Sequence, residues 1–127
     1  NEENLINSFS RKDELFNLLN EKYENFQTTP TGVMISPEGL AGEITVNHNL
    51  SDNDLAFVFS FILLNDFGII TIPAVSMPGA SATIRFDLST NDAFNLNLND
   101  LCKKIESSFN KLQEVVINED ECREIVF

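Results

Sequence analysis

The chain has 127 residues, of which 43% are hydrophobic, and a formal net charge of -12 at pH 7. This length and composition indicate one globular domain over 1–127 and argue against a disordered chain. The acidity argues against nucleic-acid binding through clustered Lys and Arg, and no apolar run reaches the roughly 20 residues that span a bilayer.

The first predicted element is a helix over 2–26, with room for a break near Ser10. Pro30 disfavours helical geometry at the residue before it, so the helix cannot run past Thr29. Apolar side chains recur at helical spacing in its second half, at Leu15, Phe16, Leu18, Leu19, Tyr23 and Phe26.

Two short strands are predicted next, over 32–36 and 42–47, because apolar and polar residues alternate in both. Pro37, Gly39 and Gly42 lie between them and are typical of turns. We therefore expect these two strands to pair as a hairpin.

A second helix is predicted over 52–66. Ser51 suits its N-cap, and Gly68 suits a left-handed stop after its last turn. This helix is apolar nearly all round, so it must be covered on more than one side, either by this domain's own sheet and first helix or by a neighbouring domain. Its apolar residues are Leu55, Phe57, Val58, Phe59, Phe61, Ile62, Leu63 and Leu64.

Two strands follow, over 68–73 and 82–88, and a loop separates them. The first is a β-branched run that Pro73 closes, so we expect it to be buried. The second places Ala82, Ile84, Phe86 and Leu88 on one face and Thr83, Arg85 and Asp87 on the other.

Arg85 is the only arginine in the apolar middle of the chain. Because it lies between core strands, we expect it to be buried and to bind a carboxylate or a phosphate. The alternative is a structural ion pair with Asp87 or with an acid on a facing strand.

A final helix is predicted to begin around Asn97, with an apolar face and a lysine-bearing face. The acidic tail over 114–127 either adds a last strand over 124–127 or docks loosely. The apolar face of the final helix comprises Leu98, Leu101, Cys102, Ile105, Phe109, Leu112 and Val116.

The order helix, hairpin, helix, strand, strand, helix predicts an α+β fold, in which a small, mostly antiparallel sheet packs against helices.

Cys102 and Cys122 are the only cysteines, and His48 is the only histidine. No metal-ligand spacing follows from them, so we predict no metal site. A structural role is favoured for His48, and reduced thiols in a cytoplasmic protein are the simplest interpretation.

The run LLNDFGIITIP, followed by a loop, ATIRFDL and a helix, resembles the C-terminal small domain of fold-type I pyridoxal-phosphate-dependent enzymes, especially the aminotransferases. The resemblance covers roughly residues 11–113 and depends on order and spacing more than on rare residues. Upstream it includes the helix over 11–26 and a P-x-G segment, either 30–32 or 37–39. The residues that carry it are Leu63, Leu64, Gly68, Ile69, Pro73 and Arg85.

The resemblance implies that Arg85 receives the α-carboxylate of an amino-acid substrate through two parallel hydrogen bonds. It also implies that pyridoxal phosphate is bound mainly by a large catalytic domain of the same enzyme, which this sequence lacks. No catalytic or cofactor-binding residue is therefore assigned here, and the chain alone is not expected to act as a transferase. The residues 74–76 depart from the family, which has Gly and then an aromatic after the proline.

Two other interpretations stand beside this one. A charge of -12 on a short domain is also typical of a small acidic binding module, such as an inhibitor or immunity-type protein, that docks on a basic partner. A third interpretation is that the chain forms one subunit of a split enzyme. Neither the substrate nor the reaction type follows from the sequence.

Overall fold

The computed structural model describes residues 2–73, 83–88, 97–118 and 125, with residues 2–10 and 72–73 described for the backbone only. The strands of the described part form one antiparallel sheet in the order β1-β2-β4-β3. The predicted α+β class is confirmed, and so is the order of elements, with one short helix added. The elements are α1 (Glu2–Asn20), β1 (Phe26–Thr29), β2 (Gly32–Ile35), α2 (Pro37–Glu43), α3 (Asp52–Phe67), β3 (Ile72–Pro73), β4 (Ile84–Asp87) and α4 (Leu98–Ile117).

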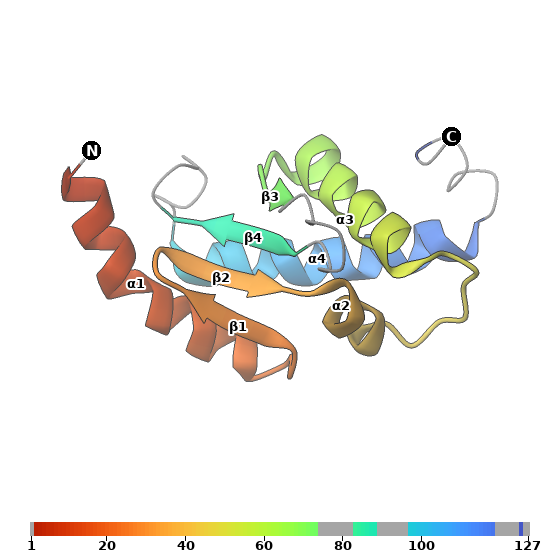
Figure 1. Cartoon of the computed structure of the whole chain (residues 1–127), viewed down its shortest axis with the longest axis horizontal. Helices are drawn as coiled ribbons and strands as arrows, with labels where there is room; N and C mark the ends of the chain where they lie inside the picture. Colours follow the sequence, from red (N-terminus) through yellow and green to blue (C-terminus); the bar gives the residue numbers. More distant parts are fainter. Residues whose placement is uncertain (1, 74–82, 89–96, 119–124, 126–127) are drawn as a thin grey trace, which may run out of the picture.

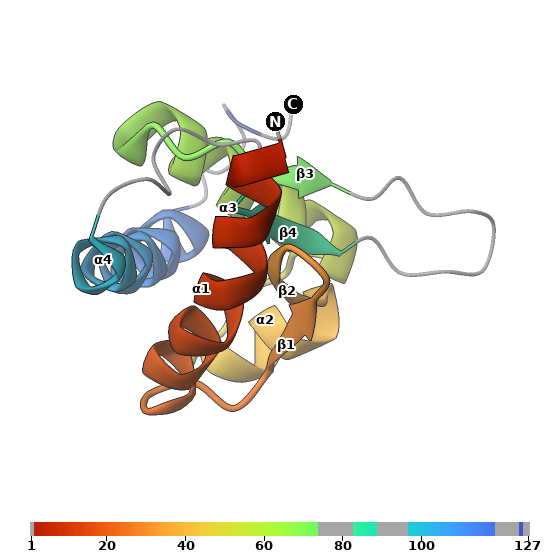
Figure 2. The same cartoon turned by 90° about the vertical axis from the view of Figure 1, so that its left-hand side faces the viewer.

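The helix α1 packs against β1 and β2 on one face of the sheet, and α4 packs against α1 and α3 (Figures 1 and 2). The core fills the space between that inner face and the helices. Phe109 of α4 joins these parts: its ring stacks on Tyr23 at 4.7 Å, lies 5.0 Å from Phe59 of α3 and meets Phe26 of β1 edge-on at 6.2 Å. No described helix covers the opposite, outer face of the sheet (Figure 2).

The first helix is continuous and shorter than predicted, because it ends at Asn20. A closing turn follows, in which the backbone N–H groups of Lys22 and Tyr23 donate to the carbonyl of Leu19. Phe26, which we assigned to the helical stripe, instead begins β1 and is buried. The chain reverses at residues 30–31, where Pro30 has the fixed φ that suits a tight turn.

The predicted strand over 42–47 is wrong, and the hairpin is formed by β1 and β2 instead. The residues 37–43 form α2, because the Ser36 hydroxyl accepts a hydrogen bond from the Gly39 N–H at 2.9 Å and Pro37 follows at the first helical position. Gly39 also permits close packing, since a Cβ there would lie 2.8 Å from the Cβ of Asn25. Gly39 and Gly42, which suggested a hairpin loop, therefore lie within the helix α2.

The ends of α3 agree with the prediction. The Ser51 hydroxyl accepts from the Asp54 N–H at 3.2 Å, and Gly68 ends the helix with φ 66°. The strand after it is shorter than expected and comprises only β3. Within the segment that links α3 to β3, Ile69 and Thr71 are buried, and the Thr71 hydroxyl is hydrogen-bonded to the Ser60 hydroxyl of α3 at 3.1 Å. Ile70 is 61% exposed, so the linker is anchored through two of its side chains.

The last helix, α4, begins after Asn97 as predicted, and the Asn97 side chain accepts from the Asn99 N–H at 2.8 Å. Its apolar face is buried, apart from half-buried Cys102. Residues 114–117 of the predicted tail belong to α4, and beyond Asn118 only Ile125 is described and packs against the core. The rest of the predicted last strand over 124–127 lies outside the described residues. None of the described helices combines the length and the apolar composition needed to cross a membrane.

Candidate functional site

Arg85 lies in the middle of β4 and projects from the outer face of the sheet. Its neighbours Ile84, Phe86 and Leu88 are buried, whereas Arg85 is exposed. The alternation of β4 therefore follows the predicted pattern. The expectation that Arg85 is buried is wrong, because the helices of the described part cover only the other face.

The strand register gives Arg85 uncharged partners on both neighbouring strands, while Asp87 lies two residues along β4 on the same face. Met34 of β2 and Ile72 of β3 are its direct partners, and Gln27 of β1 is the partner of Met34. We call these four residues the Arg85 row. Since no acid stands opposite Arg85, the alternative of an ion pair with a facing strand is not found, and no ion pair of Arg85 occurs within the described ranges.

Gly32 determines how closely β2 and β4 approach beside this row. It is the register partner of Asp87, and a Cβ on Gly32 would lie 1.9 Å from the carbonyl oxygen of Phe86. Only glycine permits that approach, so Gly32 maintains the register that places Met34 beside Arg85.

An exposed guanidinium can bind an anion but only weakly while water surrounds it. Arg has five N–H donors in a planar arrangement that matches a carboxylate or a phosphate, and it stays charged at any working pH. An exposed ion pair contributes only about 0–1 kcal/mol, because water and salt screen it. Strong binding at Arg85 therefore requires a second surface that covers the Arg85 row and excludes water.

No residue of the described part is assigned to a site for pyridoxal phosphate. The lysines are all exposed or half-buried, and no buried side-chain polar atom in the described part lacks a hydrogen-bond partner. No group of potential metal ligands gathers in that part either. The lysines concerned are Lys12, Lys22, Lys103, Lys104 and Lys111.

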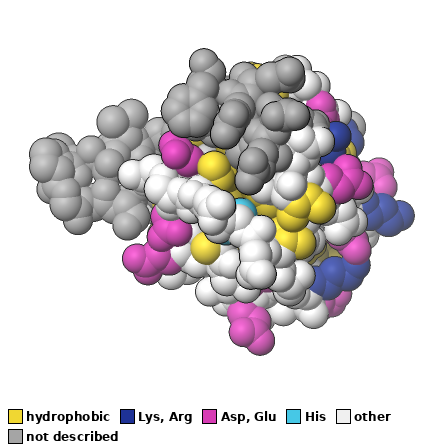
Figure 3. Space-filling model, turned by 90° about the vertical axis from the view of Figure 1, so that its right-hand side faces the viewer, with side chains coloured by type: hydrophobic (Ala, Val, Ile, Leu, Met, Phe, Trp, Pro, Cys, Tyr) yellow, Lys and Arg dark blue, Asp and Glu magenta, His cyan; other side chains and the backbone are white. Residues whose placement is uncertain are grey.

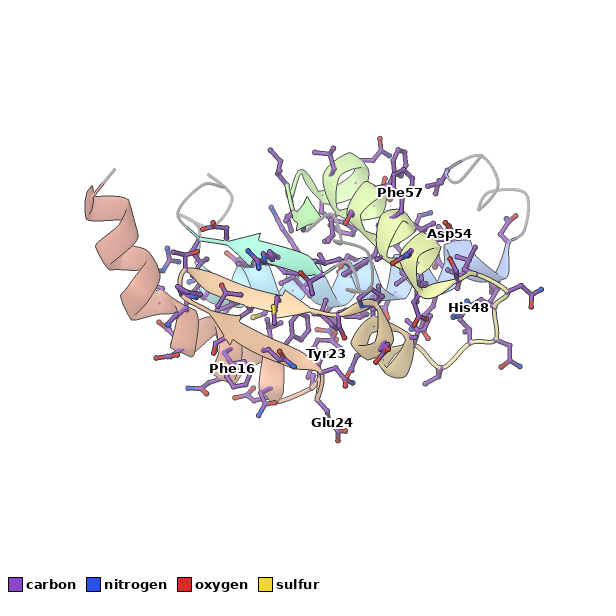
Figure 4. All side chains as sticks on the ribbon, in the orientation of Figure 1. Phe16, Tyr23, Glu24, His48, Asp54 and Phe57 are labelled. Carbon is purple, nitrogen blue, oxygen red and sulfur yellow. The ribbon has the colours of Figure 1, made fainter. Side chains whose placement is uncertain are left out.

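His48 and Cys102 occupy structural positions away from the Arg85 row. His48 Nδ1 accepts a hydrogen bond from the Leu50 N–H at 3.2 Å, in the segment between α2 and α3 (Figure 4). It lies on a face where apolar and acidic side chains mix (Figure 3). Burial raises the pKa of the Cys102 thiol to about 11, which disfavours the reactive thiolate. Neither residue lies in the Arg85 row, so neither adds a nucleophile or a base to the candidate site.

Tyr23 is also unsuited to proton transfer at neutral pH. Its ring packs against Phe26 and Phe109, and burial together with nearby Glu106 raises the pKa of the phenol to about 12. The described part of the chain therefore offers one exposed anion-binding group at the candidate site and no catalytic apparatus around it.

Comparisons with known proteins match most of the chain. The profile of the family described as the UPF0425 C-terminal domain matches residues 22–97. The chain is 40% identical over 121 residues to the UPF0425 pyridoxal phosphate-dependent protein of Methanosphaera stadtmanae, covering 93% of this chain and 32% of that protein. It is 40% identical over 95 residues to the protein of the same name from Methanothermobacter thermautotrophicus, covering 75% and 24% respectively.

The chain thus spans a third or less of the length of these relatives. No solved structure matches it.

Proposed function

This chain belongs to the UPF0425 C-terminal domain family, and we propose that it forms the small domain of a pyridoxal-phosphate-dependent enzyme of the aminotransferase type. Two relatives are named as pyridoxal phosphate-dependent, and both are about three times as long as the matched region or longer. The observation that carries the proposal is Arg85, exposed on an open sheet face with no acid opposite it. We place the enzyme in the cytoplasm.

In this proposal Arg85 binds the α-carboxylate of an amino-acid substrate. The large catalytic domain of the same enzyme binds pyridoxal phosphate, which supplies the electron sink for amino-acid chemistry. That domain also covers the Arg85 row, which removes water from the ion pair and strengthens it. The role of Arg85 is to fix one end of the substrate, so its contribution is orientation and binding.

A chimera tests this role in a whole protein. In it, this chain replaces the matched region of the Methanosphaera stadtmanae relative, and absorbance of the bound cofactor reports binding of an amino acid and of the amine that lacks its carboxylate. We expect Arg85→Gln to weaken binding of the amino acid by about 30-fold or more, as the loss of a desolvated charge partner costs about 2–5 kcal/mol. Binding of the amine should change little, because the amine makes no contact with Arg85.

Two controls sharpen the result. Arg85→Lys keeps the charge but loses the planar pair of donors, so it should also weaken amino-acid binding. Lys103→Gln removes an exposed charge from α4 and should leave both ligands unaffected. Equal losses for the amino acid and the amine in Arg85→Gln would show that Arg85 does not receive the carboxylate.

The isolated chain should not bind the cofactor specifically. Because its lysines are exposed or half-buried, titration with pyridoxal phosphate should give no saturable change in absorbance. Saturable labelling of a single lysine, identified by mass spectrometry, would contradict the assignment of the cofactor to another domain.

A further inference from the structure

The helix α3 exposes an apolar stripe on the side opposite its buried face. Phe57, Phe61 and Leu64 are 55%, 42% and 56% exposed. Their spacing of four and three residues places them on one face of the helix. Phe57 points to the side of α3 turned away from the sheet (Figure 4). We call these three residues the outer α3 stripe.

A groove continues this stripe towards α4. It has a volume of about 330 Å³, and Phe61 belongs both to its lining and to the stripe. Ile125 of the tail contributes further apolar surface, and Asn65, Asp66 and Lys111 add polar side chains to the lining. Single exposed apolar residues are common on proteins, but a continuous stripe with an adjoining groove is typical of an interaction site.

We propose that the outer α3 stripe and its groove form the surface on which the large domain of the same polypeptide docks. The proposal rests on the proposed function and extends it by naming the face that makes the contact. About two thirds or more of each relative lies outside the matched region, so a domain of this family has a large covalently linked neighbour. A second copy of this chain is a poorer occupant, because each copy carries a charge of -12 and two copies repel.

The position of α3 links this docking surface to the candidate site. Strand β3 pairs with β4 directly at Arg85, and residues 68–71 join α3 to β3. A large domain that docks on α3 and extends along this linker would reach the Arg85 row, where it could cover the guanidinium.

A tryptophan reporter tests the proposal directly, because the chain contains no Trp. We make the Phe57→Trp variant both in the isolated chain and in the chimera described above. The control is Asn17→Trp, at an exposed position of α1, in the same two proteins. The spectrum of the unsubstituted chimera is subtracted in each case. We expect acrylamide to quench the indole of the Phe57→Trp variant at least threefold less in the chimera than in the isolated chain, and the control equally in both.

The result that overturns the proposal is equal quenching of the Phe57→Trp reporter in both proteins, or protection of the Asn17→Trp reporter instead. These readouts need neither substrate nor cofactor. A failure here would therefore leave the role of Arg85 to be decided by its own binding experiment.

A charged pair provides a second measurement. Phe57→Asp with Leu64→Asp should separate the thermal unfolding of this domain from that of the large domain in the chimera, while the isolated chain still unfolds at nearly its original temperature. Asn17→Asp with Asn20→Asp adds the same two charges to exposed positions of α1 and should leave the chimera's transition intact. An unchanged transition for the stripe pair would contradict docking through α3.

Discussion

The helices α3 and α4 differ in the surface that they turn away from the core. They pack against each other, with the rings of Phe59 and Phe109 5.0 Å apart. In α4 the buried face is apolar and the outer face carries lysine and glutamate, so water completes its surroundings. In α3 both faces are apolar, and the sheet and helices of the described part cover only one of them. An amphipathic helix needs one partner, whereas a helix that is apolar all round needs two.

The largest expected effect separates the two faces of α3. Phe59→Ala removes a fully buried ring and should lower the free energy of unfolding by about 3–5 kcal/mol, through lost burial and the resulting cavity. Phe57→Ala, two residues earlier and 55% exposed, should change it by less than about 1 kcal/mol. Urea denaturation of the isolated chain measures both, and similar losses would show that the outer face already packs within this chain.

The next effect concerns how the two helices end. Gly68 closes α3 at φ 66°, whereas α4 ends at Asn118 with φ -97° and needs no glycine. Gly68→Ala should cost about 1–2 kcal/mol of unfolding free energy, because an L side chain disfavours that conformation although space is available. Gly42→Ala in α2 is the matched control and should be neutral or slightly stabilising. Equal effects of the two changes in urea denaturation would contradict the left-handed stop.

The N-caps of α3 and α4 should contribute similarly to the free energy of unfolding, although the outer faces of the two helices differ. Ser51→Ala and Asn97→Ala each remove a side-chain acceptor from the first turn, and each should cost about 1 kcal/mol. Ser51→Asp keeps an acceptor and should restore the thermal midpoint to near that of the unsubstituted chain. A loss for Ser51→Asp as large as that for Ser51→Ala would show that the cap is not the cause.

The smallest effect is expected on the outer face of α4. Lys22 Nζ lies 2.7 Å from Glu106 Oε2, but the two side chains are 59% and 44% exposed. A double-mutant cycle with Lys22→Met and Glu106→Gln should give a coupling of less than about 1 kcal/mol that declines as salt is added. A coupling above about 2 kcal/mol, unchanged by salt, would mean that this face is more enclosed than the geometry indicates.

Local signals in the sequence predicted much of the fold. Ser51 and Gly68 bound α3, Asn97 begins α4, and alternation over 82–88 placed Arg85 on the face opposite Ile84 and Phe86. These features depend on neighbours within a few residues, so a single chain reveals them. The exposure of Arg85 was predicted wrongly, because it depends on which side of the sheet the helices occupy.

The residues 36–43 were misread for a related reason. Ser36 and Pro37 can begin a turn or a helix, and nothing within the segment distinguishes the two. The helix forms where Leu40 is buried and Gly39 packs against Asn25, which lies 14 residues earlier in the chain. A distant contact selects between two locally acceptable conformations.

The bounds of α3, the start of α4 and the polar side of β4 were therefore contained in the sequence by itself, since they arise from short-range periodicity and backbone chemistry. Only the tertiary structure decided which faces stay uncovered. It left Arg85 exposed and α3 with a second apolar side, because coverage depends on how distant segments pack together.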